Sequence, residues 1–230
     1  MSEPDDAREG MGGLVGAHGM RPKRLVLILG GARSGKSAYA ERLAGQMAQG
    51  RMVAYVATAT ADDDEMRQRI TRHRAERPAD WITLEAPLDP AHALLDDARA
   101  ASAGVVLLDC VTLLVSNLLL DSAGHEMDEE RFDAAVADTR VQRAIADLLA
   151  AYRQLPASLI LVSNEVGMGL VPPYPLGRVY RDLLGRANAR LAREADAVLF
   201  MLAGLPVELK ALARAWEESA ARQLGFDANE

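Results

Sequence analysis

The chain has 230 residues, of which 50% are hydrophobic and 26% charged, enough for one aliphatic core and too few for a second catalytic domain. The chain has a formal net charge of −7, whereas nucleic-acid binding requires a basic surface, so no nucleic-acid partner is expected. A single cysteine excludes an intramolecular disulfide and a cysteine metal cluster. No secretory leader is recognisable and no apolar stretch is long enough for a membrane span, so we expect a cytoplasmic protein.

The predicted elements alternate between strands and helices. Residues 1–23 are rich in Gly, Asp and Glu without apolar periodicity, which predicts a flexible extension before a single domain at 24–230. In that domain, short aliphatic runs alternate with helical patterns, typical of an α/β fold with a mostly parallel sheet flanked by helices. The predicted strands are Leu25–Leu29, Val53–Ala57, Val105–Leu108, Leu159–Val162 and Ala197–Leu202. The predicted helices are Lys36–Ala48, Asp63–Ala75, Asp128–Arg153, Leu176–Arg193 and Val207–Leu224.

A phosphate-binding loop joins the first predicted strand to the first predicted helix. The pattern G-x-x-x-x-G-K-[ST] is typical of a P-loop, in which glycines let successive backbone N–H groups point at phosphate oxygens. Its lysine neutralises the β- and γ-phosphates, and its hydroxyl can bind Mg²⁺. The alternative, a glycine-rich turn, does not account for the strand before it and the helix after it. The residues of the pattern are Gly30, Gly31, Ala32, Arg33, Ser34, Gly35, Lys36 and Ser37.

Polar residues follow two of the other predicted strands. A P-loop needs a carboxylate at the end of a neighbouring strand to hold Mg²⁺ through water, and Asp109 ends the strand at 105–108. The alternative for Asp109 is a carboxylate that only makes a turn. The strand at 159–162 ends in Ser-Asn-Glu-Val-Gly-Met-Gly, residues 163–169, as expected where a ligand approaches the edge of an open α/β sheet. A plain turn is the alternative there too.

A basic stripe lies on the predicted helix at 63–75 and just beyond it. Arg69, His73 and Arg77 recur every four residues, so a helix would bring them to one face, about 6 Å apart. The two guanidinium groups favour the neutral form of the histidine, which can attack a phosphorus atom. The alternative is a half-buried packing histidine beside Met66 and Ile70. No metal-ligand spacing exists among the chain's histidines and its cysteine.

Together, these segments resemble the bifunctional adenosylcobinamide kinase/adenosylcobinamide-phosphate guanylyltransferase family of cobalamin biosynthesis. The resemblance covers most of residues 25–210 and is most specific at 73–78 and 164–169. It also includes Tyr55-Val56-Ala57-Thr58-Ala59 and Leu108-Asp109-Cys110-Val111-Thr112. The extension before Arg24 departs from the family pattern, as does Asp109, where many relatives carry Glu.

The resemblance implies a P-loop fold, commonly a homotrimer, and two reactions. ATP or GTP phosphorylates adenosylcobinamide with Mg²⁺ as cofactor. GTP then guanylylates a histidine, and GMP passes to adenosylcobinamide phosphate, giving adenosylcobinamide-GDP. His73 falls at the position of that histidine and joins Lys36 as a catalytic residue, while Ser37 and Asp109 are the expected metal ligands. The other nucleotide-contacting positions implied are Ala57, Thr58, Ala59, Arg74, Ala75, Glu76, Arg77 and Glu85.

Two other classes of protein share a P-loop. A monofunctional metabolite kinase would also carry a mobile arginine-bearing lid, but it would form no covalent intermediate and would not need His73. A nucleotide-switch or motor ATPase would need regions that transmit hydrolysis to a partner, and a compact acidic chain offers little sign of them. Covalent labelling from GTP therefore separates these alternatives.

Overall fold

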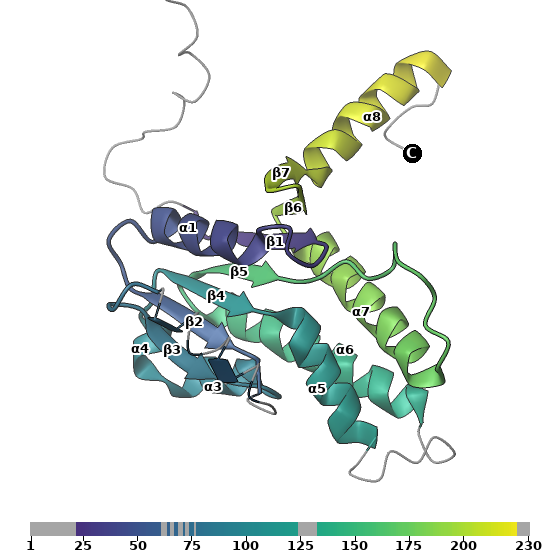
Figure 1. Cartoon of the computed structure of the whole chain (residues 1–230). Coiled ribbons are helices and arrows are strands. Elements are labelled where there is room, and N and C mark those ends of the chain that lie inside the picture. Colours follow the sequence, from purple (N-terminus) through teal and green to yellow (C-terminus); the bar gives the residue numbers. More distant parts are fainter. Residues whose placement is uncertain are drawn as a thin grey trace, which may run out of the picture.

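The computed structural model describes residues 22–60, 64, 67–68, 71, 74–75, 77–123 and 133–224. They form a seven-stranded sheet of order β3-β2-β4-β5-β1-β6-β7, with helices on both faces (Figure 1). All neighbouring strands are parallel except β6 and β7, so the predicted α/β class with a mostly parallel sheet is confirmed. The strands are β1 (Leu25–Gly30), β2 (Val53–Ala57), β3 (Ile82–Glu85), β4 (Val105–Asp109), β5 (Ser158–Val162), β6 (Ala197–Leu202) and β7 (Leu205–Glu208).

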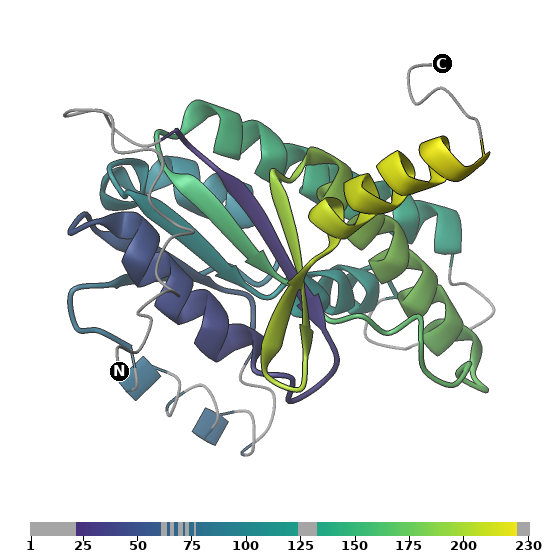
Figure 2. The same cartoon turned by 90° about the horizontal axis from the view of Figure 1, so that it is seen from above.

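The helices cover the two faces of the sheet unequally, as Figure 2 shows. Helix α1 packs on one face through Ala40, Ala44 and Ala48, whose small side chains recur every four residues and let the helix approach the sheet. The larger cluster on the other face draws on α3, α5, α6 and α7. The helices are α1 (Lys36–Ala48), α3 (Pro90–Asp96), α4 (Ala98–Ala101), α5 (Val111–Ala123), α6 (Ala134–Gln154), α7 (Pro175–Glu194) and α8 (Leu209–Leu224).

Burial on both faces explains the unbroken apolar character of the central strands. In β1, Val26 and Ile28 face the α1 cluster, whereas Leu25, Leu27 and Leu29 face the larger cluster. All five side chains are buried, so neither face leaves room for a polar residue. Apolar and polar residues therefore do not alternate in the sequence of β1, because both faces of this strand are buried.

Most of the predicted elements are confirmed to within a residue or two. The bounds of β2, β6 and α1 agree with the prediction, those of β1, β4 and β5 differ by one residue at one end, and those of α7 differ by one residue at each end. Helix α6 begins at Ala134 because the Asp133 side chain accepts hydrogen bonds from the N–H groups of Ala135 and Val136, at 2.8 and 3.3 Å. The predicted start at residues 128–132 lies outside the described residues. In the predicted helix at 63–75, the described residues 64, 67–68, 71 and 74–75 are helical.

The sequence interpretation missed β3, β7, α3, α4 and α5, and it was wrong at the start of the last helix. Residues 207–208 belong to β7, not to the predicted helix Val207–Leu224. A tight turn at Ala203 and Gly204, with φ values of 51° and 83°, folds β7 back onto β6, where Met201 faces Pro206. This antiparallel hairpin takes up the residues that helical periodicity had assigned to α8.

The first described residues contact the domain, whereas the last helix extends away from it. Residues 1–21 of the predicted extension lie outside the described residues, but Lys23 packs over the Tyr152 ring at 4.2 Å and donates a hydrogen bond to the carbonyl of Leu155, at 2.7 Å. At the other end, α8 projects away from the sheet (Figure 1). No helix among the described residues is long and apolar enough to cross a membrane.

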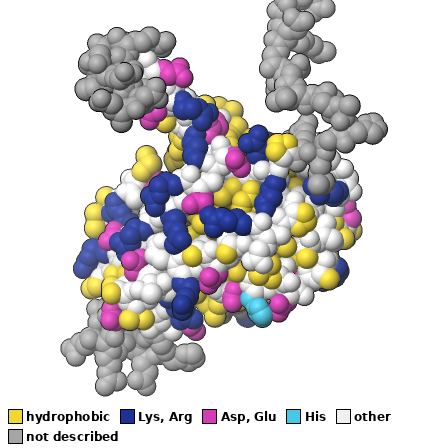
Figure 3. All heavy atoms as spheres, turned by 180° about the vertical axis from the view of Figure 1, so that it is seen from behind, with side chains coloured by type: hydrophobic (Ala, Val, Ile, Leu, Met, Phe, Trp, Pro, Cys, Tyr) yellow, Lys and Arg dark blue, Asp and Glu magenta, His cyan; other side chains and the backbone are white. Residues whose placement is uncertain are grey.

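Basic side chains on the face formed by α6 and α7 are interspersed with acidic ones (Figure 3). Arg186 of α7 pairs with Asp138 of α6 at 3.2 Å, and Arg153 of α6 pairs with Glu194 of α7 at 2.8 Å. These ion pairs connect the two helices across their exposed sides. The charges of these two arginines are therefore balanced locally.

Candidate active site

The P-loop wraps around the amino terminus of α1. The backbone turns at Arg33 and Gly35, whose φ values are 57° and 89°, and Gly35 caps the helix without a side-chain hydrogen bond. The Lys36 side chain is 7% exposed, and its Nζ donates to the carbonyl of Gly31 at 2.5 Å and to the Ser34 hydroxyl at 3.4 Å. The lysine ammonium group and the helix N–H groups therefore converge on the loop, as anion binding requires.

Three of the predicted nucleotide-contacting residues lie in one row across the carboxyl ends of the strands. Ala57 of β2 is in register with Glu85 of β3 on one side and with Asp109 of β4 on the other. Asp109 in turn is in register with Val162 of β5. The P-loop follows β1 at the same edge, so the structure brings these positions and the loop to one side of the sheet.

The predicted adjacency of the Asp109 strand and the P-loop strand is wrong, because β5 lies between β4 and β1. At a strand spacing of about 4.8 Å, β4 and β1 are about 10 Å apart. A metal ion held by both Ser37 and Asp109 would therefore lie in front of the end of β5. The order of parallel strands depends on how crossover helices pack, which no local pattern reveals.

Asp109 is held by a tyrosine that the sequence analysis did not single out. The hydroxyl of Tyr55, a 3% exposed residue of β2, donates to Asp109 Oδ2 at 3.0 Å. Burial, and then the negative charge of Asp109, raise the pKa of Tyr55, so the hydroxyl keeps its proton for this bond. The available signal was a tyrosine inside an aliphatic strand, because a buried phenol needs a polar partner.

Arg77 lies over one face of the Tyr55 ring. Its guanidinium carbon lies 3.3 Å from the ring centroid, and its Nη1 donates to the Thr83 hydroxyl at 3.4 Å. The Nε of Arg77 is buried and makes no hydrogen bond to any described group. Tyr55 thus contacts two predicted site residues, Asp109 through its hydroxyl and Arg77 through its ring.

The segment that carries the predicted nucleophile reaches the same edge of the sheet. Arg74 lies 3.7 Å from Glu85, and both side chains are largely exposed, so the pair stabilises the fold little. Ala75 is helical and exposed. His73 and Glu76 lie outside the described residues, as does Arg69 of the predicted stripe. Arg74 and Arg77, which follow His73 in the sequence, therefore contact residues of β2 and β3.

The Thr58 side chain makes hydrogen bonds to the backbone of a neighbouring strand end. Its side chain is fully buried, and its hydroxyl donates to the carbonyl of Cys110 and accepts from the N–H of Cys110, both at 2.8 Å. Asn117 Nδ2 donates to the carbonyl of Thr58 at 2.8 Å. These contacts join the ends of β2 and β4 next to the cis peptide bond between Asp109 and Cys110. The Thr58 side chain thus positions neighbouring residues, and the adjacent Ala59 is half-buried.

The cysteine next to Asp109 is a poor nucleophile. Burial, and then the charge of Asp109, raise the pKa of Cys110 to about 11, so its thiol stays protonated near neutral pH. Within the described part of the chain, no group of three or more His, Cys, Asp or Glu residues could hold a metal ion. Oxygen ligands for Mg²⁺ can still come from Ser37 and Asp109 together with nucleotide phosphates and water.

A buried polar network, also absent from the sequence prediction, supports the loop after β5. Ser163 donates to Asn188 Oδ1 at 2.7 Å, and Asn188 Nδ2 donates to the carbonyl of Asn164 at 3.0 Å. The N–H of Asn164 donates to the Thr112 hydroxyl at 2.7 Å. The network therefore links β5 to α5 and α7 behind the carboxyl edge of the sheet.

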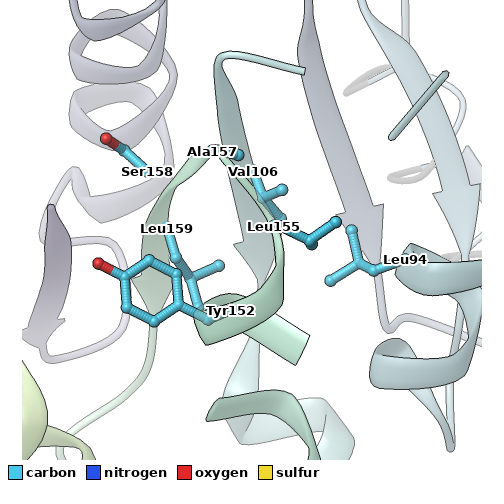
Figure 4. Close-up of a pocket in the computed structure, with 7 residues that line it drawn as sticks. All are labelled: Leu94, Val106, Tyr152, Leu155, Ala157, Ser158 and Leu159. Carbon is cyan, nitrogen blue, oxygen red and sulfur yellow. The ribbon is translucent and has the colours of Figure 1, made fainter. Parts of the chain in front are cut away.

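The small apolar cavity in Figure 4 lies elsewhere. It is near the amino end of β5, away from the P-loop, and it lacks the charged groups that a phosphate site needs. We therefore assign it no part in nucleotide binding. It is lined by Leu94, Val106, Tyr152, Leu155, Ala157, Ser158 and Leu159.

Comparison with known proteins identifies the family. A family model described as cobinamide kinase/cobinamide phosphate guanyltransferase matches residues 26–209. The bifunctional adenosylcobalamin biosynthesis protein CobU of Salmonella typhimurium is 44% identical over 188 residues, which cover 81% of this chain and 99% of that protein. The bifunctional protein CobP of Pseudomonas aeruginosa is 46% identical over 184 residues, covering 80% of this chain and 96% of that protein. Among solved structures, the flagellar accessory protein FlaH of Methanocaldococcus jannaschii aligns with a TM-score of 0.42 at 13% identity, over 80% of this chain and 74% of FlaH, too low a likeness to support a conclusion. The family match spans the P-loop, Tyr55, Asp109 and the loop after β5, and the chain belongs to the cobinamide kinase/cobinamide phosphate guanyltransferase family.

Proposed function

We propose that this chain phosphorylates adenosylcobinamide with ATP or GTP and then transfers GMP from GTP, through His73, to adenosylcobinamide phosphate. Family membership supports the kinase and nucleotidyltransferase activities, and the curated relatives are named bifunctional. The monofunctional kinase is therefore the less favoured alternative. The structural observation that carries the proposal is that the P-loop and Glu85, which Arg74 contacts, lie along the same carboxyl edge of the sheet.

In the kinase step, the P-loop holds the triphosphate of the donor. Lys36 Nζ, now hydrogen-bonded to Gly31 and Ser34, would exchange these bonds for oxygens of the β- and γ-phosphates. The substrate hydroxyl oxygen bonds to the γ-phosphorus as the bridging bond to the β-phosphate breaks, and the hydroxyl proton leaves to solvent. Lys36 stabilises the transition state because negative charge develops next to its ammonium group.

Ser37 and Asp109 are the residues that we propose to hold Mg²⁺. Both offer oxygen atoms, the ligands that Mg²⁺ prefers, and the hydrogen bond from Tyr55 orients the carboxylate of Asp109. When bound, Mg²⁺ supplies charge neutralisation between the phosphates. Asp109 is one methylene shorter than the Glu of many relatives, and binding through a water molecule suits this shorter reach.

In the guanylyl step, a neutral ring nitrogen of His73 attacks the α-phosphorus of GTP and pyrophosphate leaves. The new phosphorus–nitrogen bond then breaks when a phosphate oxygen of adenosylcobinamide phosphate attacks, which regenerates His73 and releases adenosylcobinamide-GDP. Arg77, held over Tyr55, and Arg74, beside Glu85, are the described cations closest in sequence to the reacting histidine. Their charges favour the neutral imidazole and offset the charge of the phosphates.

We further propose a homotrimer that works in the cytoplasm, with residues 24–230 as one domain and residues 1–23 as an extension outside the catalytic machinery. Support for self-association comes from α8, which projects from the domain (Figure 1). Leu209, Leu212 and Trp216 are spaced three and four residues apart and are 37%, 56% and 70% exposed. Such an apolar stripe on a projecting helix is typical of a surface that another chain covers.

The two activities can be separated by mutation. Incubation of the enzyme with GTP labelled at the α-phosphate should give a covalent label that is labile in mild acid and stable in base. His73→Ala should abolish this label and the formation of adenosylcobinamide-GDP while leaving the kinase active, because the P-loop is intact. Lys36→Ala should lower kinase turnover by about a hundredfold or more.

The matched control is His92→Ala. His92 lies on the exposed side of α3, where it pairs with Asp96 at 3.0 Å, so its loss should leave both activities unchanged. Accumulation of enzyme-bound GMP in His73→Ala, or a label that survives mild acid, would show that another residue is the nucleophile. Normal phosphorylation by Lys36→Ala would contradict the role of the P-loop.

A further inference from the structure

The loop after β5 exposes an unusual group of apolar side chains. Met168, Leu170, Val171 and Tyr174 are 80%, 96%, 64% and 58% exposed, and they lie within seven consecutive residues. Single exposed apolar side chains are common, whereas a contiguous group marks a surface that binds something apolar. We call residues 165–174 the β5–α7 loop.

The β5–α7 loop is held in place from behind. Arg178 of α7 donates to the carbonyls of Pro172 and Pro173, at 3.2 and 2.8 Å, and Arg181 donates to the carbonyl of Gly167. Within the loop, the Glu165 carboxylate accepts from the N–H of Gly167 at 2.6 Å. The apolar side chains therefore stand on a braced backbone, and binding would not have to order the loop first.

The loop is also fastened to the P-loop. The N–H of Glu165 donates to the carbonyl of Gly30 at 3.1 Å, and the N–H of Ser163 donates to the carbonyl of Ile28 at 2.9 Å. Because β5 lies between β1 and β4, this loop is nearer to the P-loop than the ends of β2 and β3, the strands that Arg77 and Arg74 contact. A large acceptor whose hydroxyl reaches the γ-phosphate consequently has the β5–α7 loop as its neighbouring free surface.

We propose that the β5–α7 loop is the binding surface for the corrin ring of the substrate. A corrinoid is a broad macrocycle that carries methyl groups and amide side chains around its rim. The methyl-bearing surface suits the exposed side chains of Met168, Leu170 and Val171. This assignment deepens the proposed function and rests on it, because it names where that substrate binds.

The test compares truncations of exposed apolar side chains inside and outside the β5–α7 loop. The double variant Met168→Ala/Leu170→Ala should raise the KM for adenosylcobinamide about tenfold or more, because two apolar contacts are lost. The KM for the nucleotide and covalent labelling from GTP without corrinoid should not change, since the P-loop is intact. Val136→Ala, at a 58% exposed position on α6, is the control and should leave every value unchanged. Equilibrium dialysis of adenosylcobinamide should show the same loss of affinity without nucleotide.

Each other outcome would overturn the assignment. An unchanged KM for adenosylcobinamide, or a change equal to that of Val136→Ala, would mean that the ring binds elsewhere. A raised nucleotide KM would make the loop part of the nucleotide site, and a smaller assembly by light scattering would make it a subunit interface. Failure of the proposed function differs from all of these, because the wild-type enzyme itself would then leave adenosylcobinamide unphosphorylated.

Discussion

At the scale of single residues, Tyr55 connects two of the predicted site residues. Its ring lies under the guanidinium of Arg77, and its hydroxyl fixes one oxygen of Asp109. The other carboxylate oxygen remains to bind water or metal. We therefore interpret Tyr55 as a positioning residue, which acts on the reaction through Asp109 and Arg77.

Removal of the Tyr55 hydroxyl tests this interpretation. Tyr55→Phe keeps the ring beneath Arg77 but removes the donor to Asp109, so the carboxylate loses its fixed orientation. We expect several-fold more Mg²⁺ for half-maximal phosphorylation, with a loss of about 1 kcal/mol in the free energy of unfolding. A Mg²⁺ titration of the kinase reaction and denaturant unfolding measure the two effects.

The control is Tyr39→Phe, since Tyr39 lies on α1 with Arg42 over its ring, whereas the tyrosine hydroxyl bonded to Asp109 is that of Tyr55. It should leave the Mg²⁺ titration unchanged. Identical titrations for Tyr55→Phe and the wild-type enzyme would show that the hydrogen bond has no part in metal binding.

At the scale of elements, the junction of β1, β6 and the P-loop has no room for a side chain. A Cβ atom at Gly30 would lie 2.6 Å from the carbonyl oxygen of Met201 and 2.9 Å from the Ser34 hydroxyl. The φ of Gly30 is also positive, at 151°. A glycine is needed here because the P-loop leaves the sheet against the neighbouring strand.

Gly30→Ala should accordingly separate β1 from β6 and distort the P-loop. We expect a loss of about 1–3 kcal/mol in the free energy of unfolding and weaker nucleotide binding. Gly45→Ala is the matched control, because Gly45 lies within α1 and a Cβ atom there would meet nothing within 4 Å. It should leave stability unchanged or raise it by up to about 1 kcal/mol.

Denaturant unfolding of the two variants, together with nucleotide titration, provides the measurement. Equal stability of Gly30→Ala and the wild-type protein would contradict the steric account. If Gly45→Ala lost as much free energy of unfolding as Gly30→Ala, the effect would come from replacing any glycine and not from the close contacts at Gly30.

At the scale of the whole molecule, α8 exposes an apolar stripe that none of the described elements covers. Leu212→Ser/Trp216→Ser should shift the assembly toward single chains, because it removes two apolar side chains of that helix that are 56% and 70% exposed. Light scattering over a range of protein concentrations measures the change. Val136→Ser replaces a comparably exposed apolar side chain on α6 and should leave the mass unchanged.

The wild-type protein should have three times the mass of the chain under the same conditions. A wild-type protein of single-chain mass would contradict the proposed trimer. A trimer that persists in the double variant would instead move the interface away from α8.

Local chemistry made the P-loop and its flanking elements predictable from sequence. Glycines at 30, 31 and 35, the following Lys36 and Ser37, and an aliphatic strand before them act over a few residues, so their pattern suffices. The strands β2 and β6 were equally readable, because aliphatic runs between polar residues suit a sheet covered on both faces. Family resemblance added the reactions and His73, which local patterns alone could not select.

Only the tertiary structure decided what depends on distant parts of the chain. It placed β5 between β1 and β4, because strand order follows from how the crossover helices pack. It joined Tyr55 to Asp109 and Arg77, which lie 54 and 22 positions further along the chain. It also folded residues 205–208 back onto β6 where helical periodicity favoured α8. The sequence by itself thus determined which chemical groups the protein carries and the local elements that hold them, whereas long-range packing decided which of those groups meet.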